Sequence, residues 1–295
     1  MRAAFLGLGA IGRPIAAHLV QQFDLAVWNR TASRAGDFAR ETGATAARTA
    51  REAAYGSDLV FTCLPNSPEL ESVLEGPDGL EAGLAPGALL VDLTSGIPAV
   101  SRRIAARLAR KGIHFLDAPV SGGTAGAEAG TLTIMVGGEA AAFERARPAL
   151  ETFGKRIVHV GPAGAGHALK AVHNMLIAVN VFALGEGLTT LAKAGVAPRT
   201  ALDVINHANG RSFVSERLVP ERVLSGAWPR TFRLALLDKD VDIARALAAE
   251  EGIEAPMIDT VSRLLHQAHA ALGEEADHVE VIRLHERQAG VELRG

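Results

Sequence analysis

Residues 167–194 read HALKAVHNMLIAVNVFALGEGLTTLAKA, and this stretch decides how the chain is organised. As one α-helix it is predicted to be roughly 40 Å long, at about 1.5 Å per residue. It is apolar on nearly all sides, which is typical of a helix buried between other elements. Polar residues interrupt it too often for a membrane span: Lys170, His173, Asn174, Asn180 and Glu186. Strand and helix patterns alternate before it and helical patterns follow it, so it is expected to connect two domains.

The composition indicates a two-domain protein of a reducing compartment. The 295 residues suffice for two sizeable cores. A net charge of −3 with well-mixed signs argues against a nucleic-acid partner. The single cysteine, Cys63, excludes an internal disulfide. Because Arg2–Leu6 already reads as a core strand, no signal peptide is expected, and we expect a cytoplasmic protein with no membrane partner.

The N-terminal residues carry a dinucleotide-binding pattern. The apolar run at residues 2–6 is followed by GLGAIG at 7–12, then by a helical pattern and a second strand, LAVWNR. A glycine pattern alone is weak in a chain with 31 glycines, but between a first strand and a first helix it predicts a pyrophosphate site at the helix N-terminus. The cofactor-binding residues of this turn are predicted to be Gly7, Leu8, Gly9, Ala10, Ile11 and Gly12.

The fold class that follows is α/β. We expect an N-terminal Rossmann dinucleotide-binding domain over residues 1–162 and an all-α domain over residues 163–295, joined by the long helix at about 167–194.

The end of the second predicted strand selects the cofactor. An NAD-binding Rossmann unit normally places Asp or Glu there, to bind the adenosine 2′-hydroxyl. This chain instead has Asn29, Arg30 and Thr31, with Arg34 shortly after. Because Arg can pair with a 2′-phosphate and stack on adenine, these four residues favour NADP(H) over NAD(H). The plainer interpretation is that Arg30 and Arg34 are ordinary surface charges.

Further candidate residues follow later strands of the predicted sheet. Leu64 and Pro65 end one buried strand, at the edge where cofactors lie. Thr94 and Ser95 end the next, where their hydroxyls can touch the nicotinamide ribose or substrate, or cap the following helix. The loop Ser121, Gly122 and Gly123 presents backbone amides that can grip a carboxylate. Cys63 is expected to be a small core residue rather than a nucleophile.

Lys170 and Asn174 are the residues of the long helix that point to chemistry. They are spaced i, i+4 and therefore project from one face. The chain uses Arg for most of its 30 basic residues, so its few lysines stand out. Lysine can serve as a general acid or base, and Asn174 can hold the lysine or a substrate hydroxyl in line. The alternatives are a cation at a helix end and a packing amide.

The second half of the chain reads as five helices, at 198–208, 212–226, 233–252, 256–273 and 278–288. Lys239 and Asp240 lie within the third, and no salt bridge is expected between them because i, i+1 residues do not face each other. Phe213 and Phe232 could line the cleft, but both are expected to pack in the core. No metal cluster is expected, on the grounds that the sequence has no C-x-x-C, no H-E-x-x-H and no pair of acids at ligand spacing. The apolar helices suggest a homo-oligomer, a dimer or a tetramer.

Four motifs together resemble the β-hydroxyacid dehydrogenases, a family that includes 3-hydroxyisobutyrate dehydrogenase and the glyoxylate/succinic semialdehyde reductases. They are GLGAIG at 7–12, DAPVSGG at 117–123, GAGHALKAVHN at 164–174 and LLDKD at 236–240, in the family's order. The resemblance covers nearly the whole chain. It implies a Rossmann domain, a long connecting helix and a helical second domain, with hydride transfer between NADP and a small β- or γ-hydroxyacid or its semialdehyde.

The resemblance also assigns roles to single residues. Lys170 matches the catalytic lysine, with Asn174 beside it, and Ser121, Gly122 and Gly123 match the loop that binds the substrate carboxylate. Leu64, Pro65 and Ser95 match cofactor contacts, and Lys239 matches a lysine that reaches cofactor or substrate. Two alternatives remain on the same fold: an imine reductase and a non-catalytic NADP-binding module. Both branches commonly lack the lysine, so Lys170 counts against them.

Overall fold

The computed structural model describes residues 2–294, in two compact units that meet within one helix. The first unit runs to Lys170 and the second begins at Ala171. The first unit thus extends eight residues beyond the expected Rossmann boundary at 162, because the first turn of the long helix is bound to it.

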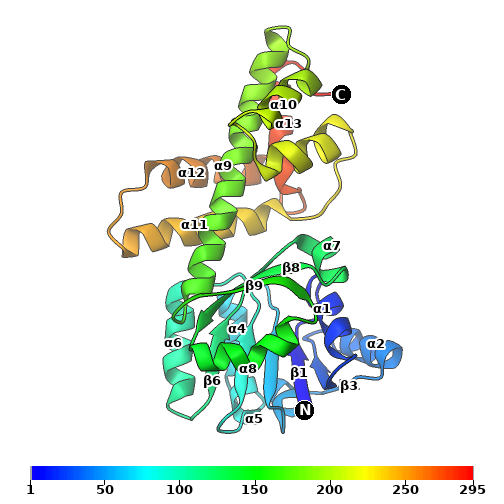
Figure 1. The fold of residues 1–295 in the computed structure, drawn as a ribbon, viewed down its shortest axis with the longest axis vertical. Coiled ribbons are helices and arrows are strands. Elements are labelled where there is room, and N and C mark those ends of the chain that lie inside the picture. The colour runs from blue at the N-terminus through cyan, green and yellow to red at the C-terminus, as the bar shows by residue number, and fades with distance from the viewer. Residues whose placement is uncertain (1, 295) are drawn as a thin grey trace. The chain divides into compact units, whose positions relative to one another are not determined.

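A nine-stranded sheet forms the centre of the first unit (Figure 1). Its order is β3-β2-β1-β4-β5-β6-β8-β7, and β9 pairs with β8. The neighbouring strands β3, β2, β1, β4, β5 and β6 are all parallel. Strand β8 is antiparallel to both β6 and β7, and β9 is parallel to β8. The bounds are β1 Arg2–Leu6, β2 Asp24–Trp28, β3 Thr45–Ala46, β4 Leu59–Thr62, β5 Leu89–Asp92, β6 His114–Asp117, β7 Val120–Ser121, β8 Leu132–Gly138 and β9 Gly154–Gly161.

Helices cover both faces of this sheet, and the strand residues alternate between two cores. On β1, Ala3 and Phe5 belong to one apolar cluster and Ala4 and Leu6 to the other. Strands buried on both faces read as continuous apolar runs, as expected of a parallel sheet. The first cluster is completed by α1 Gly12–Leu19, α2 Ala32–Thr42, α7 Gly123–Glu128 and α8 Ala140–Leu150. The second is completed by α3 Ala50–Ala54, α4 Ser67–Leu74, α5 Leu80–Gly83 and α6 Pro98–Ala109.

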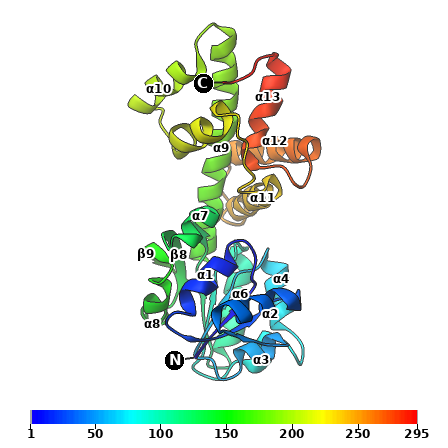
Figure 2. The same ribbon diagram turned by 90° about the vertical axis from the view of Figure 1, so that its right-hand side faces the viewer.

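The second unit is built of helices joined by loops, with one isolated β-bridge between Arg233 and Asp277, and Figure 2 shows its helices grouped about the C-terminal part of α9. One apolar cluster holds them together, and a proline begins both α10 and α12. The bounds are α9 Ala165–Lys193, α10 Pro198–His207, the π-helical η1 Val214–Leu224, α11 Leu234–Glu250, α12 Pro256–Leu272, the 3₁₀ turn η2 His278–Glu280 and α13 Val281–Ala289.

The long helix α9 begins two residues before the predicted start and ends one residue before the predicted end. By length and composition alone it could cross a membrane. Within the helical unit, however, its residues Ala178, Val181 and Leu188 are buried in the apolar cluster, so it serves as a core helix. Phe232 packs against the same cluster, but Phe213 is 62% exposed, and the expectation that it lies in the core was wrong.

Candidate functional site

The glycine turn after β1 has the shape that a dinucleotide requires. A Cβ at Gly7 would lie 2.2 Å from the Cys63 carbonyl oxygen, and one at Gly12 would lie 2.0 Å from the Gly7 carbonyl oxygen. Both glycines are therefore needed for the close approach of backbone to backbone. Gly9 differs, because nothing lies within 4 Å of its Cβ position. A pyrophosphate can therefore approach the backbone closely at Gly9.

The helix that follows the turn leaves its amides available to an anion. The N-cap of α1 is Ile11, which cannot accept a hydrogen bond from the first turn, and no acidic residue lies in that turn. The unpaired N–H groups and the helix dipole both favour a negative group at this end. The residues from Gly7 to Gly12 thus fit a pyrophosphate.

The residues after β2 are polar and basic, as the sequence indicated. Asn29 stabilises the glycine turn, because its Oδ1 accepts a hydrogen bond from the Leu8 amide at 3.0 Å. The Arg30 guanidinium donates from Nη1 to both carboxylate oxygens of Glu69 on α4, at 3.0 Å to Oε1 and 3.1 Å to Oε2. Its side chain is 78% exposed, and such an exposed pair is weak. Thr31 is the N-cap residue of α2, and Arg34 lies exposed in its first turn.

A buried polar network joins the ends of β4 and β5, next to the glycine turn. Asp92 Oδ1 accepts hydrogen bonds from the Thr62 hydroxyl at 2.8 Å and the Thr94 amide at 3.2 Å. The Thr94 Oγ1 in turn accepts from the Leu64 amide at 3.1 Å. Thr94 is buried and holds the loop that begins with Leu64 and Pro65, whereas Ser95 is half-buried. Neither hydroxyl caps α6, whose N-cap residue is Ile97.

Cys63 lies beside this network as a partly buried thiol. Burial raises the pKa of Cys63 to about 12, and the nearby Asp92 charge adds to the effect. The thiol therefore stays protonated at neutral pH, which suits a packing residue and not a nucleophile.

The loop at 121–123 contains a short strand that the sequence did not predict. Val120 and Ser121 pair with β8, and Gly122 and Gly123 follow with φ of 139° and 65°. L-residues rarely adopt these angles, so the glycines permit the turn. Ser121 is half-buried, while both glycines are exposed, and this leaves their amides accessible.

Asp117, which the sequence placed in a motif without assigning it a role, fixes the start of α9. Its Oδ1 accepts from the Gly164 amide at 2.7 Å and its Oδ2 from the His167 amide at 2.9 Å. Burial raises the pKa of Asp117, although His167 and the two amides oppose that shift. A carboxylate on the first amides of a helix complements the dipole, so β6 sets the position of the turn that leads to Lys170.

His167 adds a second connection to this turn. It is almost fully buried, and its Nδ1 lies 2.6 Å from the Ser101 hydroxyl of α6. Its Nε2 lies 3.7 Å from Asp92 Oδ2. Lys170 follows one turn later on α9 and is only 8% exposed. Among these residues the sequence pointed to Lys170 alone, because the contacts of His167 with Ser101 and Asp92 exist only in the folded chain.

In the helical unit, Asp240 brings two predicted residues together. Asn174 of α9 donates from Nδ2 to Asp240 Oδ2, and its Oδ1 lies 3.0 Å from His173 Nδ1. Lys239 Nζ lies 2.8 Å from Asp240 Oδ1. The expectation of no salt bridge between Lys239 and Asp240 was therefore wrong, because a long flexible lysine can fold back to its neighbour although their Cβ atoms diverge. Asp240 is buried and acts as the common acceptor.

Comparison with known proteins identifies the two parts of the chain. Residues 2–161 match the NAD binding domain of 6-phosphogluconate dehydrogenase, and residues 164–285 match the NAD-binding domain of NADP-dependent 3-hydroxyisobutyrate dehydrogenase. The chain is 38% identical to 2-(hydroxymethyl)glutarate dehydrogenase of Eubacterium barkeri, over 100% of this chain and 98% of that protein.

Solved structures agree with this. The 3-hydroxyisobutyrate dehydrogenase of Mycobacterium tuberculosis with L-serine is 32% identical, with a TM-score of 0.89 over 96% of this chain and 99% of that one. Psf3 in complex with NADP+ and 2-OPP is 27% identical, with a TM-score of 0.85 over 96% of this chain and 99% of that one. An imine reductase of Myxococcus stipitatus, 22% identical with a TM-score of 0.66 over 96% of this chain and 98% of that one, shares the fold alone. The chain belongs to the β-hydroxyacid dehydrogenase family, the hydroxyacid oxidoreductases that include 3-hydroxyisobutyrate dehydrogenase.

Proposed function

We propose that this protein is an NADP(H)-dependent oxidoreductase that interconverts a small β- or γ-hydroxyacid and its semialdehyde. The balanced reaction is R–CHO + NADPH + H⁺ ⇌ R–CH₂OH + NADP⁺. The cofactor supplies or accepts the hydride when bound. What remains for the protein is to hold both reactants and to move one proton.

Lys170 carries the proposal, as the general acid in reduction and the general base in oxidation. Its Nζ would give a proton to the aldehyde oxygen, or take one from the hydroxyl, as the hydride moves. Its burial and the anchoring of its helix by Asp117 support this role, because a proton donor must be held in line with the reacting oxygen. Asn174, fixed by Asp240, is proposed to orient the hydroxyl or the lysine.

The substrate carboxylate is proposed to bind at Ser121, Gly122 and Gly123, with Lys239 as a second cation. The accessible amides after β7 and the Ser121 hydroxyl are suitable donors to a carboxylate. The substrate class follows from the names of the relatives, which include a 2-(hydroxymethyl)glutarate dehydrogenase and a 3-hydroxyisobutyrate dehydrogenase.

NADP is proposed as the preferred cofactor, because the residues directly after β2 include Arg30 and no carboxylate until Asp37. Psf3, a structural relative, was solved with NADP+. Cofactor residues are proposed to be Gly7–Gly12, Asn29, Arg30, Thr31, Arg34, Leu64, Pro65, Thr94, Ser95 and Lys239. We also propose a cytoplasmic location.

The test compares wild type, Lys170→Ala and Lys193→Ala on a panel of semialdehydes, hydroxyacids and cyclic imines with both cofactors. Lys193 is a matched control, because it is an exposed lysine at the other end of the same helix. We expect Lys170→Ala to lower kcat by about 10²- to 10⁴-fold, the usual range for a lost acid–base group. NADPH binding, followed by nicotinamide fluorescence, should be retained.

Three other outcomes would each contradict part of the proposed function. Equal losses in the two lysine variants would remove the specific role of Lys170. Turnover of imines but not semialdehydes would favour the imine reductase, and cofactor binding with no turnover of any substrate would favour a non-catalytic module.

A further inference from the structure

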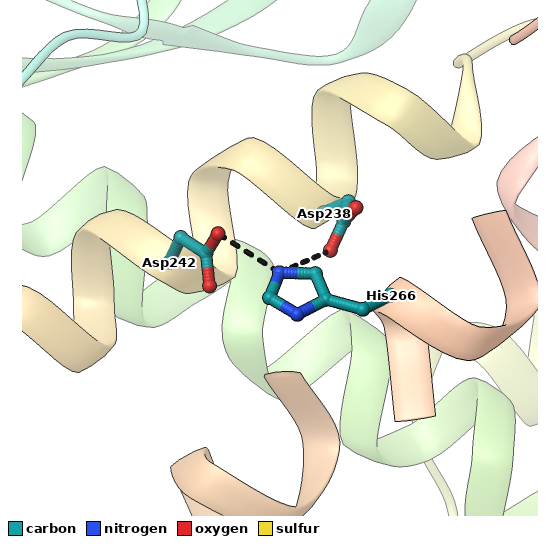
Figure 3. A group of neighbouring side chains, drawn as sticks. All are labelled: Asp238, Asp242 and His266. Carbon is teal, nitrogen blue, oxygen red and sulfur yellow. Dashed lines mark hydrogen bonds and ion pairs between the residues drawn. The ribbon is translucent and has the colours of Figure 1, made fainter. Parts of the chain in front are cut away.

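Two neighbouring helices of the second unit bring two carboxylates and an imidazole, none of them assigned a role above, to one point beside Lys239. Asp238 and Asp242 are spaced i, i+4 on α11, and His266 lies on α12, which packs beside it. Figure 3 shows that one oxygen of each carboxylate is directed at the same ring nitrogen of His266. His266 Nε2 lies 2.9 Å from Asp242 Oδ2 and 3.3 Å from Asp238 Oδ1.

The second oxygen of each carboxylate is held by another residue of α12. Ser262, which is buried, donates its hydroxyl to Asp242 Oδ1 at 2.8 Å. The His269 Nδ1 lies 2.9 Å from Asp238 Oδ2. Ser262, His266 and His269 are spaced i, i+4, i+7 and so share one face of α12. Neighbours that fix the free oxygen of a ligating carboxylate are a regular feature of metal sites in proteins.

The observation that points to a ligand is at Asp238, which is 8% exposed as a whole residue. Within residues 2–294 its Oδ1 has no hydrogen-bond partner, and it lies 3.3 Å from His266 Nε2 in an ion pair. The single Nε2 hydrogen of His266 can serve only one acceptor well, and Asp242 Oδ2 is the closer one. A buried carboxylate oxygen without a donor is costly, and a cation at the point of convergence would satisfy it.

The spacing and the chemistry both fit a transition metal. With bonds of about 2.0–2.2 Å, ligand atoms in a tetrahedral zinc site lie roughly 3.3 Å apart. The two measured separations are close to this, and all three ligand atoms lie within 4.8 Å of one another. An imidazole with two carboxylates suits Zn²⁺ better than Mg²⁺ or Ca²⁺, which prefer oxygen ligands alone. Asp242 and His266 are about half-exposed, so a water can take the fourth position.

We propose that Asp238, Asp242 and His266 bind one divalent transition-metal ion of the Zn²⁺ class, which clamps α11 to α12. The nearby charges are Arg245, whose guanidinium lies 3.9 Å from Asp242 Oδ1, and Glu274, which pairs with His269. Because Lys239 lies on α11 between the two carboxylate ligands, the ion would also stiffen the turn that holds Lys239 and Asp240. The site was not anticipated from the sequence, because the i, i+4 pair Asp238 and Asp242 was overlooked and the histidine comes from a different helix.

The experiment measures Zn²⁺ binding to the full, untagged chain by calorimetry, with Co²⁺ as a spectroscopic probe and Mg²⁺ as a comparison. The variants are Asp242→Asn, His266→Gln and Ser262→Ala. The matched control is His207→Gln, because His207 also forms an exposed pair with an aspartate, Asp203 on α10, at 3.4 Å. We expect one Zn²⁺ per chain, the visible bands of four-coordinate Co²⁺, and a rise in the thermal unfolding midpoint that a chelator reverses.

In Asp242→Asn and His266→Gln, affinity should fall at least about tenfold and the thermal shift should disappear, while Ser262→Ala should lose about 10- to 100-fold, as typical when the support of a ligand is removed. The His207→Gln variant should bind as wild type. The proposal is overturned if wild type binds no Zn²⁺, if Mg²⁺ gives the same response, or if His266→Gln binds as wild type. An equal loss in His207→Gln would show scattered surface binding and would overturn it too. None of these readouts depends on dehydrogenase activity.

Discussion

At the scale of single residues, the proposed preference for NADP over NAD rests on Arg30. In the structure its guanidinium is held by Glu69. Since the pair is exposed, a 2′-phosphate with two negative charges should displace the carboxylate. Glu69 would then act as a competitor that lowers NADP affinity.

Substitution of either partner tests this view. We expect Arg30→Gln to raise KM for NADPH about tenfold or more, with little change for NADH, because a charge-assisted hydrogen bond is lost only with the phosphate. Glu69→Gln should lower KM for NADPH. Steady-state kinetics with both cofactors gives the answer. A wild-type preference for NAD by more than about tenfold would refute the role of Arg30.

The residue scale also shows what a sequence can and cannot supply. The glycine turn was predictable, because G-x-G-x-x-G combines a tight turn, an open approach and close packing within six positions. Lys170 and Asn174 are site residues predicted from their spacing on one helix, and their roles stay a prediction. Asp92, Asp117 and Ser101 were not assigned roles, since each contacts a residue dozens of positions away, through a sheet whose order the sequence does not display.

At the scale of elements, the helices were predicted more closely than the strands around the site. Apolar periodicity and the prolines at helix starts fixed α9, α10, α11 and α12 to within a few residues. The two-residue strands β3 and β7 have no periodicity to reveal them, and β7 is defined only by its pairing with β8.

Asp277 shows how one carboxylate can organise an element. It caps η2, and its Oδ2 accepts from the Thr231 and Phe232 amides at 2.6 and 2.8 Å. Burial alone would raise the pKa of Asp277, but the hydrogen bond and charge of His278 and the two amides lower it well below its ordinary value. A lowered acid pKa stabilises the fold above the unfolded-state pKa of about 3.9, and that stabilisation is lost as pH falls below it.

We therefore expect Asp277→Asn to destabilise the helical unit by about 2 kcal/mol at neutral pH, since charged hydrogen bonds are lost. The gap between variant and wild type should narrow as pH falls below about 4, where wild type loses the same contribution. Urea unfolding of both proteins in a Trp28→Phe background isolates the signal, because Trp228, the other tryptophan, packs in the helical unit. A gap that is constant with pH would contradict this assignment.

At the scale of the whole molecule, α9 carries an apolar surface that its own chain leaves exposed. Val172 and Leu176 are spaced i, i+4 on this helix and are 36% and 53% exposed. Apolar residues that share one face of a core helix and remain in solvent are typical of an interface between subunits. We propose that the protein forms a homo-oligomer through this face.

The test is the mass in solution, by size-exclusion chromatography with light scattering, against a chain mass of 30.8 kDa. Wild type should give at least twice that mass, and Leu176→Asp should shift it toward a single chain, because a buried charge without a partner is costly at an interface. Val204→Asp is the control: Val204 is 62% exposed on α10, so the same change there should leave the oligomer intact. A monomeric wild type, or equal dissociation in both variants, would exclude α9 as the interface.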